Sequence, residues 1–209
     1  MLVSKVFGTA VVSTRFLRTS APQRSEAPTS SESAPLWSLK GKRVFVAGVA
    51  DDQGYGWAVA YALANAGAEL VFGVWPPVLN IFSMAWKNGK FNKSRKLANG
   101  KMLEIAKVYS LDAAYDTIDD VPPEVCKEKR YAALKAYTIA DVAALVKKDF
   151  GKVDLLVHSL ANGPEVKKLL HETSRAGYLS GISTSAYSNV SMLRNFAPLM
   201  PPGGKFSVN

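Results

Sequence analysis

Three glycines, Gly48, Gly54 and Gly56, stand where they could bring the backbone close to a phosphate group. They follow a continuous apolar run and precede an alanine-rich helical stretch, residues 57–66. The N-terminus of a helix exposes unpaired N–H groups and the positive end of the helix dipole, and therefore attracts phosphate. The spacing differs from the G-x-G-x-x-G of most dinucleotide sites, so a tight turn without a ligand is the alternative. The strand–turn–helix context favours a phosphate site.

A tryptophan, Trp75, ends the second apolar run and is followed by two prolines. In dinucleotide-binding folds a carboxylate at this strand end commonly receives the adenosine ribose. An indole here is suited to form a wall beside an adenine ring, or else to anchor the following segment in the core. No arginine or lysine stands at this strand end to meet a 2′-phosphate. The sequence therefore favours NAD over NADP.

The histidines and the cysteine indicate no second site. His158 and Ser159 are neighbours on a predicted strand, so their side chains face opposite sides and cannot share a proton; His158 is predicted to be a buried strand-end residue. His171 has no cysteine or carboxylate at metal-ligand spacing, so no metal site is predicted. The single cysteine, Cys126, has no partner for a disulfide and is predicted to be a buried or bystander thiol.

The elements that must position these residues alternate short apolar runs with longer amphipathic ones. Strands are predicted at residues 44–49, 69–74, 103–111, 153–158 and 205–208. Helices are predicted at 57–66, with Gly67 as its C-terminal cap, at 138–148 and at 174–196. This alternation is typical of the α/β class, so we expect a doubly wound parallel sheet of the Rossmann type.

Two segments, residues 75–101 and 113–137, are too long for simple connections and are predicted to be insertions. The first carries a run of basic residues without any acid: Lys87, Lys90, Lys93, Arg95, Lys96 and Lys101. Such a run could steer an acidic partner, or it could simply be a solvated face.

The first 36 residues differ in composition from the rest of the chain. They hold eleven serines or threonines, four basic residues and two acids. This composition is typical of an organelle transit peptide rather than of a packed core. The short apolar stretch at 6–12 would also suit a weak secretory segment of a bipartite plastid signal. A disordered tail without a targeting role is the alternative.

The overall composition is that of a globular protein, with 48% hydrophobic and 21% charged residues. No apolar run approaches the length of a membrane-spanning helix, so no membrane association is predicted. The net charge of +9 suits acidic partners. Nucleic-acid binding is not predicted, because no recognition motif accompanies this charge.

Together, several stretches resemble the plastid-type enoyl-[acyl-carrier-protein] reductases, a divergent branch of the short-chain dehydrogenases/reductases. They are GVADDQGYGWA, LVFGVW, VLNIF, KVYSLDA, DDVPPEV, DFGKVDLLVHSLANGPEVKKLL and ETSRAGYL. The resemblance covers residues 39–204, and the long segment after Trp75 matches the plant and apicomplexan type. It implies NADH as cofactor and, as partner, an acyl carrier protein carrying an enoyl thioester. It also implies a homotetramer for the full-length family.

The resemblance further implies roles at the adenosine half of the cofactor. Gly48, Gly54 and Tyr55 would line the pyrophosphate and ribose. Trp75 would flank the adenine. Asp112, with Ala113 beside it, would accept a hydrogen bond from the adenine amino group.

At the other half of the cofactor, Ser159, Leu160 and Ala161 would hold the nicotinamide. Asn162 and Gly163 would border the acyl site. All of these residues follow predicted strands, which agrees with the rule that ligands bind beyond the carboxyl ends of parallel strands.

The family reaction needs a tyrosine hydroxyl aimed at the thioester oxygen and a lysine seven residues later that binds the nicotinamide ribose. None of the eight tyrosines of this chain has a lysine at that spacing. The wider superfamily's Tyr-x-x-x-Lys occurs only at Tyr131 and Lys135, which precede the VHSLANG strand, so we interpret that pair as chance. No catalytic residue is therefore predicted.

The sequence thus predicts a transit peptide at 1–36 and a Rossmann-like domain at 37–209 that lacks its C-terminal third. The truncation would reflect a gene-model or cloning error more readily than an evolved short form. As it stands, the chain is expected to be inactive and to bind NADH poorly. The predicted location is a plastid, with the mitochondrion as alternative. Two further functions stay open: another divergent short-chain reductase, and a non-catalytic cofactor-binding fragment.

Overall fold

The computed structural model describes residues 37–208. In this part of the chain a sheet of five parallel strands has the order β3-β2-β1-β4-β5. The strands are β1 (Arg43–Ala47), β2 (Glu69–Val74), β3 (Ile105–Ser110), β4 (Leu155–His158) and β5 (Lys205–Val208). The predicted Rossmann-like, doubly wound α/β class is confirmed.

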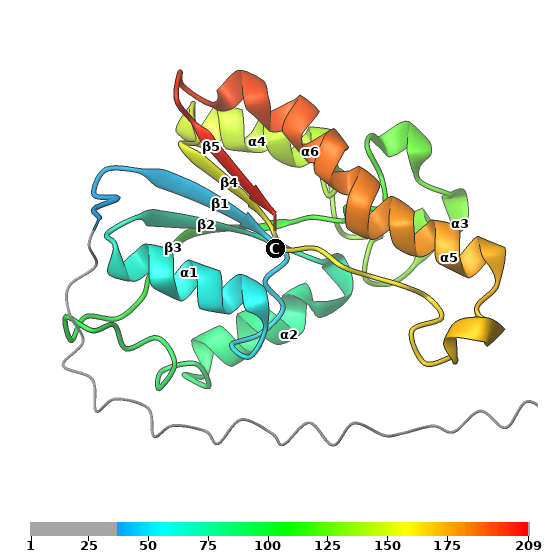
Figure 1. Cartoon of the computed structure of the whole chain (residues 1–209), viewed down its shortest axis with the longest axis horizontal. Helices are drawn as coiled ribbons and strands as arrows, with labels where there is room; N and C mark the ends of the chain where they lie inside the picture. Colours follow the sequence, from blue (N-terminus) through cyan, green and yellow to red (C-terminus); the bar gives the residue numbers. More distant parts are fainter. Residues whose placement is uncertain (1–36, 209) are drawn as a thin grey trace, which may run out of the picture. The chain divides into compact units, whose positions relative to one another are not determined.

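Helices cover both faces of this sheet. They are α1 (Tyr55–Asn65), α2 (Pro76–Lys87), α3 (Pro123–Lys127), α4 (Ile139–Phe150), α5 (Arg175–Ile182) and α6 (Ser188–Phe196). Figure 1 shows α1 and α2 below the sheet and α4 and α6 above it. Short turns of 3₁₀ helix lie at Ile118–Asp120, Leu170–Glu172 and Ala197–Leu199.

The two cores follow from the alternation of side chains along each strand. In β1, Val44 and Val46 pack with α1 and α2, whereas Phe45 and Ala47 pack with α4 and α6. Both sets are fully buried. A strand that is apolar on both faces must lie in the middle of a helix-covered parallel sheet, and β1 does so between β2 and β4.

The first of the two predicted insertions is mostly not an insertion. Residues 76–87 form α2, the ordinary crossover helix between β2 and β3, and two prolines occupy its first turn. Proline is well tolerated there because the first N–H groups of a helix have no intrahelical partner. Only the following segment, which we call the basic loop (residues 87–101) and which begins at the last residue of α2, is an extension.

The basic loop is held to the body of the fold by its aromatic and arginine side chains. Phe91 packs against Trp57, Phe82 and Trp86. The Arg95 guanidinium lies over the Trp86 ring at 3.8 Å and donates to Glu104 at 2.8 Å.

Two other boundaries differ from the prediction. The predicted strand 103–111 is shorter, Ile105–Ser110, and the register of β2 with β3 shifts between Leu70 and Val71. The predicted helix 174–196 exists, but a π-turn at Ser183–Tyr187 separates α5 from α6. The helix predicted from Thr138 is confirmed, with Thr138 as N-cap in a capping box with Asp141 and Gly151 at its end.

Candidate cofactor-binding site

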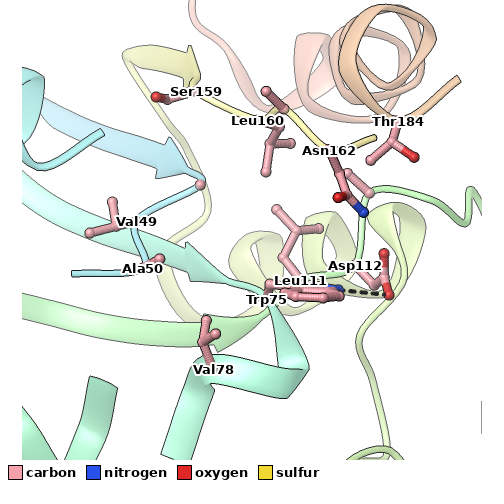
Figure 2. A pocket seen from close by; sticks show the side chains of 13 residues that line it. Val49, Ala50, Trp75, Val78, Leu111, Asp112, Ser159, Leu160, Asn162 and Thr184 are labelled. Atoms are coloured by element: carbon pink, nitrogen blue, oxygen red, sulfur yellow. Dashed lines mark hydrogen bonds between the residues drawn. The ribbon is translucent and has the colours of Figure 1, made fainter. Parts of the chain in front are cut away.

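A cavity of about 200 Å³ opens at the carboxyl ends of β1, β2, β3 and β4. It lies where the strand order reverses, between β1 and β4, which is the position at which doubly wound sheets bind ligands. Figure 2 shows its walls. The lining residues are Gly48, Val49, Ala50, Trp75, Val78, Leu111, Asp112, Ala113, Ser159, Leu160, Ala161, Asn162 and Thr184.

Gly48 brings the turn after β1 into direct contact with the segment after β4. Its φ of +99° lies in the region that favours glycine, and a β-carbon there would overlap the carbonyl oxygen of Ser159. Its N–H donates to the Gly73 carbonyl at 2.9 Å. Gly56 packs against Gly48, since a β-carbon on it would lie 2.5 Å from the Gly48 carbonyl oxygen. Gly48, backed by Gly56, thus presents bare backbone at the cavity floor.

The turn between Gly48 and α1 is organised by two aspartates. Asp51 accepts hydrogen bonds from the N–H groups of Gln53 and Gly54 at 2.8 and 3.1 Å. Asp52 accepts one from the Ser94 hydroxyl of the basic loop at 2.6 Å, which lowers the pKa of the Asp52 carboxyl. The second contact ties the basic loop to the glycine-containing turn between β1 and α1.

Trp75 and Asp112, the two residues predicted to contact the adenine, are hydrogen-bonded to each other. The Trp75 indole N–H donates to the Asp112 carboxylate at 3.2 Å, and the ring stays 44% exposed at the cavity wall (Figure 2). Trp75 is therefore a cavity residue and not a core anchor. Asp112, only 6% exposed, also accepts from the Ala114 N–H at 3.0 Å.

Asp112 accepts from a third donor, which was not predicted from the sequence. The Tyr131 hydroxyl donates to the same carboxylate at 2.6 Å, and burial, together with this hydrogen bond, raises the pKa of the phenol. Tyr131 comes from the segment between β3 and α4, far from Asp112 in the sequence. Because its hydroxyl is held by Asp112 and Lys135 is exposed, the pair Tyr131 and Lys135 does not form a catalytic unit in this structure.

Eight of the eleven predicted site residues line the cavity, and Gly54, Tyr55 and Gly163 do not. Tyr55 is the first residue of α1 and is 84% exposed. Gly163 lines a separate, more open pocket with Glu165 and Tyr178. Gly54, Tyr55 and Gly163 therefore do not contact the cavity in this structure.

Thr184 lines the cavity from the π-turn, where an uninterrupted helix was predicted from the sequence. The π-turn is joined to the β4 segment through Ser185, whose hydroxyl accepts from the Asn162 N–H and donates to the Asn162 carbonyl, both at 3.1 Å. The run Ser183-Thr184-Ser185 was the available signal, because serine and threonine are weak helix formers that hydrogen-bond locally to the backbone.

His158, at the end of β4, is fully buried as predicted. Its Nε2 lies 2.8 Å from the Ser188 hydroxyl. Burial lowers the pKa of His158 below its usual range, because an imidazolium would lose its hydration.

This lowered pKa predicts that folding stability falls as the pH drops from about 7 to about 5. Below the unfolded-state pKa of His158 the unfolded chain binds a proton that the folded chain does not, so protonation favours unfolding. The loss is at most about 1.4 kcal/mol per pH unit for one group. Urea unfolding at several pH values would measure it. His158→Gln should flatten this part of the profile, and His171→Gln, at an exposed position, should not; identical profiles in all three proteins would contradict the prediction.

Residues 37–208 show neither a metal cluster nor a membrane-spanning helix. In that range no group of three or more histidine, cysteine or acidic side chains could hold a metal ion. None of the helices described there is both long and apolar enough to cross a membrane. Cys126 is exposed and its Sγ lies 3.6 Å from the Tyr137 hydroxyl, so the prediction of a buried thiol is wrong, and a bystander thiol stays a prediction.

Comparison with known proteins places these features in a family context. The family described as enoyl-(acyl carrier protein) reductase matches residues 133–208. The chloroplastic enoyl-[acyl-carrier-protein] reductase [NADH] 1 of Oryza sativa subsp. japonica is 58% identical over 178 residues, covering 84% of this chain and 48% of the relative. The chloroplastic NADH enzyme of Arabidopsis thaliana is 58% identical over 166 residues, covering 79% of this chain and 43% of the relative.

Among solved structures, the enoyl-acyl-carrier-protein reductase of Plasmodium berghei with triclosan has a TM-score of 0.77 and 44% identity. That match covers 80% of this chain and 58% of the other. The chain thus spans about half the length of the curated relatives it matches. The resemblance predicted from the residues is confirmed as homology over most of the chain.

Proposed function

We propose that this chain carries the NADH-binding site of an enoyl-[acyl-carrier-protein] reductase of fatty-acid synthesis. The observation that carries the proposal is the cavity at the strand-order reversal, which unites eight residues from separate stretches that resemble this family. The identity of 58% to NADH-dependent chloroplastic reductases supports the same cofactor and reaction. In that reaction NADH supplies a hydride to the β-carbon of a trans-2-enoyl thioester.

The residues present fit a dinucleotide. Gly48 presents bare backbone at the cavity floor, and backbone of this kind can approach a pyrophosphate closely. The Trp75 indole is partly exposed at the cavity wall and is held by Asp112, so the pair would bind and orient the adenine. Ser159, Leu160 and Ala161 would hold the nicotinamide, and Asn162 would border the acyl thioester. The tyrosine–lysine pair of the family is not among these 209 residues.

The cellular setting follows from the same relatives. The homologues from rice and Arabidopsis are chloroplastic enzymes, which supports a plastid location. The predicted transit peptide at residues 1–36 lies outside the described residues and stays a prediction, as does the mitochondrial alternative. We extend the proposal to an acyl carrier protein as partner and to a homotetramer of the full-length family.

The proposal predicts that residues 1–209 bind NADH more tightly than NADPH, by at least about tenfold or 1.4 kcal/mol. No lysine or arginine lines the cavity to pair with a 2′-phosphate. Fluorescence titration with both cofactors would measure the two dissociation constants. Equal affinity for NADPH would contradict the prediction, and no binding of either would contradict the proposed site.

One cation does approach the end of β2, and it was not predicted from the sequence. The Arg130 guanidinium donates to the Pro77 carbonyl at 2.6 Å, although Arg130 is not a lining residue. Arg130→Gln is therefore the matched variant for this titration. We expect it to change neither dissociation constant by more than about twofold, since the guanidinium is already bound to the backbone.

For the acyl carrier protein, an acidic protein, we predict that the basic loop speeds association. Its five lysines are exposed and form no ion pair within the described residues: Lys87, Lys90, Lys93, Lys96 and Lys101. Unpaired surface charge acts mainly on the association rate and is screened by salt. Arg95 is unsuitable for the test because its side chain is 11% exposed and paired with Glu104.

The measurement is the association rate of an acyl carrier protein at low and high salt. The triple variant Lys93→Glu, Lys96→Glu, Lys101→Glu should slow association several-fold at low salt and little at high salt. A matched triple reversal at Lys127, Lys129 and Lys135, also exposed, is the control. Equal slowing in both triple variants would show that the net charge of the protein alone changes the association rate, and it would exclude steering by this loop.

A further inference from the structure

His158, Ser188 and Thr184 form a buried hydrogen-bonded chain that the proposed function does not use. The Ser188 hydroxyl lies 2.8 Å from His158 Nε2 and donates to the Thr184 carbonyl at 2.6 Å. His158 ends β4, Ser188 begins α6, and Thr184 lies in the π-turn between α5 and α6. His158 and Ser188 are fully buried.

The chemistry of these groups determines where the protons are. A carbonyl oxygen only accepts, and a serine hydroxyl has one proton, so the Ser188 proton lies toward Thr184. The Ser188 oxygen must then accept from His158, which requires the imidazole proton on Nε2. His158 Nδ1 has no hydrogen-bond partner among the described residues. An unprotonated Nδ1 without a partner costs less folding free energy than a buried Nδ1–H or a buried imidazolium without a partner.

We propose that His158 is a positioning residue: as the neutral Nε2–H tautomer it holds Ser188, and through Ser188 the π-turn, so that Thr184 faces the cavity. A π-turn widens the helix by one residue and leaves its carbonyls poorly matched to intrahelical partners, and such turns persist where side chains stabilise them. The Ser188 hydroxyl supplies a partner for the Thr184 carbonyl. Thr184 lines the cavity opposite the strand ends (Figure 2).

The same residues explain why this link connects two parts of the site. His158 directly precedes Ser159, which lines the cavity from the sheet side. Its backbone pairs with Ala47 of β1, the residue before Gly48. The hydrogen-bonded chain from His158 through Ser188 to Thr184 therefore joins the β1–β4 floor of the cavity to its helical wall. This inference concerns the geometry of the protein, and only the affinity measurement below rests on the proposed function.

The tautomer can be observed directly by NMR, because the chain has only two histidines. With ¹⁵N-labelled histidine, the His171→Gln variant leaves His158 as the sole signal. We expect the Nε2–H tautomer at neutral pH. An Nδ1–H tautomer, or an imidazolium at neutral pH, would overturn the proposal.

The positioning role is tested by the Thr184 methyl resonance. His158→Leu and Ser188→Ala should both shift it, and His158→Gln, whose amide N–H₂ can replace the Nε2–H donor, should restore it. Ser191→Ala is the matched control, because Ser191 is equally buried on α6 and its hydroxyl has no partner within the described residues. An equal shift in Ser191→Ala, or no shift in Ser188→Ala, would overturn the proposal.

Cofactor affinity gives an independent reading. His158→Leu and Ser188→Ala should weaken NADH binding about three- to tenfold, whereas His158→Gln and Ser191→Ala should leave it nearly unchanged. The melting temperature of each variant would check that it is folded at the temperature of the titration. Unchanged affinity in Ser188→Ala would overturn the link to the cavity. If the wild-type chain binds no NADH, the proposed function fails, and the tautomer and methyl measurements still decide this inference.

Discussion

Gly48→Ala is expected to lower the free energy of unfolding by more than about 4 kcal/mol and to abolish NADH binding. The new β-carbon would overlap the Ser159 carbonyl oxygen, which is backbone and cannot rotate away. Alanine also tolerates the φ of +99° poorly. Relief requires separating the ends of β1 and β4, which are hydrogen-bonded through the Ser159 N–H and the Ala47 carbonyl at 2.9 Å.

Two other glycines separate the causes of this loss. Gly151→Ala introduces the strain of a positive φ of 75° into open space and should cost about 1 kcal/mol. Gly54→Ala introduces neither strain nor overlap, since its β-carbon would lie 3.8 Å from Asp51, and should cost no more than about 1 kcal/mol. Urea unfolding of the three variants would compare them. A Gly48→Ala protein no less stable than Gly151→Ala would mean that the contact with Ser159 is not tight.

The sheet was predictable because buried parallel strands leave a strong signal. Residues 44–49 and 153–158 are apolar almost throughout, and glycine or threonine marks the helix ends beside them. The prediction was wrong for residues 76–87, because the length of the segment 75–101 suggested an insertion where an ordinary crossover helix begins at Pro76. Proline breaks the interior of a helix but suits its first turn, and only the packing of Phe82 against Phe72 distinguishes the two cases.

The floor of the site was predictable for a related reason. Gly48 and Ser159 directly follow β1 and β4, Asp112 lies two residues after β3, and the carboxyl ends of parallel strands meet at one edge of a sheet. Tyr131, Arg130 and Thr184 were missed because connecting segments carry them to that edge. No local pattern reveals that Tyr131 folds back on Asp112, nineteen positions earlier in the chain. Long-range hydrogen bonds of this kind need the fold.

The second large effect is expected at Asp112, because three donors depend on its carboxylate. Asp112→Ala would leave the Tyr131 hydroxyl, the Trp75 indole N–H and the Ala114 N–H without their acceptor. A buried donor that loses its partner costs about 1–3 kcal/mol. Trp75 is partly exposed and can turn to water, so we expect a total loss of about 3 kcal/mol in the free energy of unfolding.

Asp116→Ala is the matched control for this loss. Asp116 also accepts from a tyrosine hydroxyl, that of Tyr187 at 2.9 Å, but Tyr187 is 44% exposed. Water can replace that acceptor, so the change should cost less than about 1 kcal/mol.

The same network predicts how Asp112 affects NADH binding. Without its acceptor the indole of Trp75 is free to leave the cavity wall, so Asp112→Ala should weaken NADH binding at least about tenfold. Tyr131→Phe keeps the carboxylate and removes only one donor, so it should weaken binding far less. In the double variant the loss should match that of Asp112→Ala alone, because the phenol acts on the site through the carboxylate. Additive losses in this cycle would show that Tyr131 reaches the cofactor by a route of its own, and unchanged affinity in Asp112→Ala would remove Asp112 from the site.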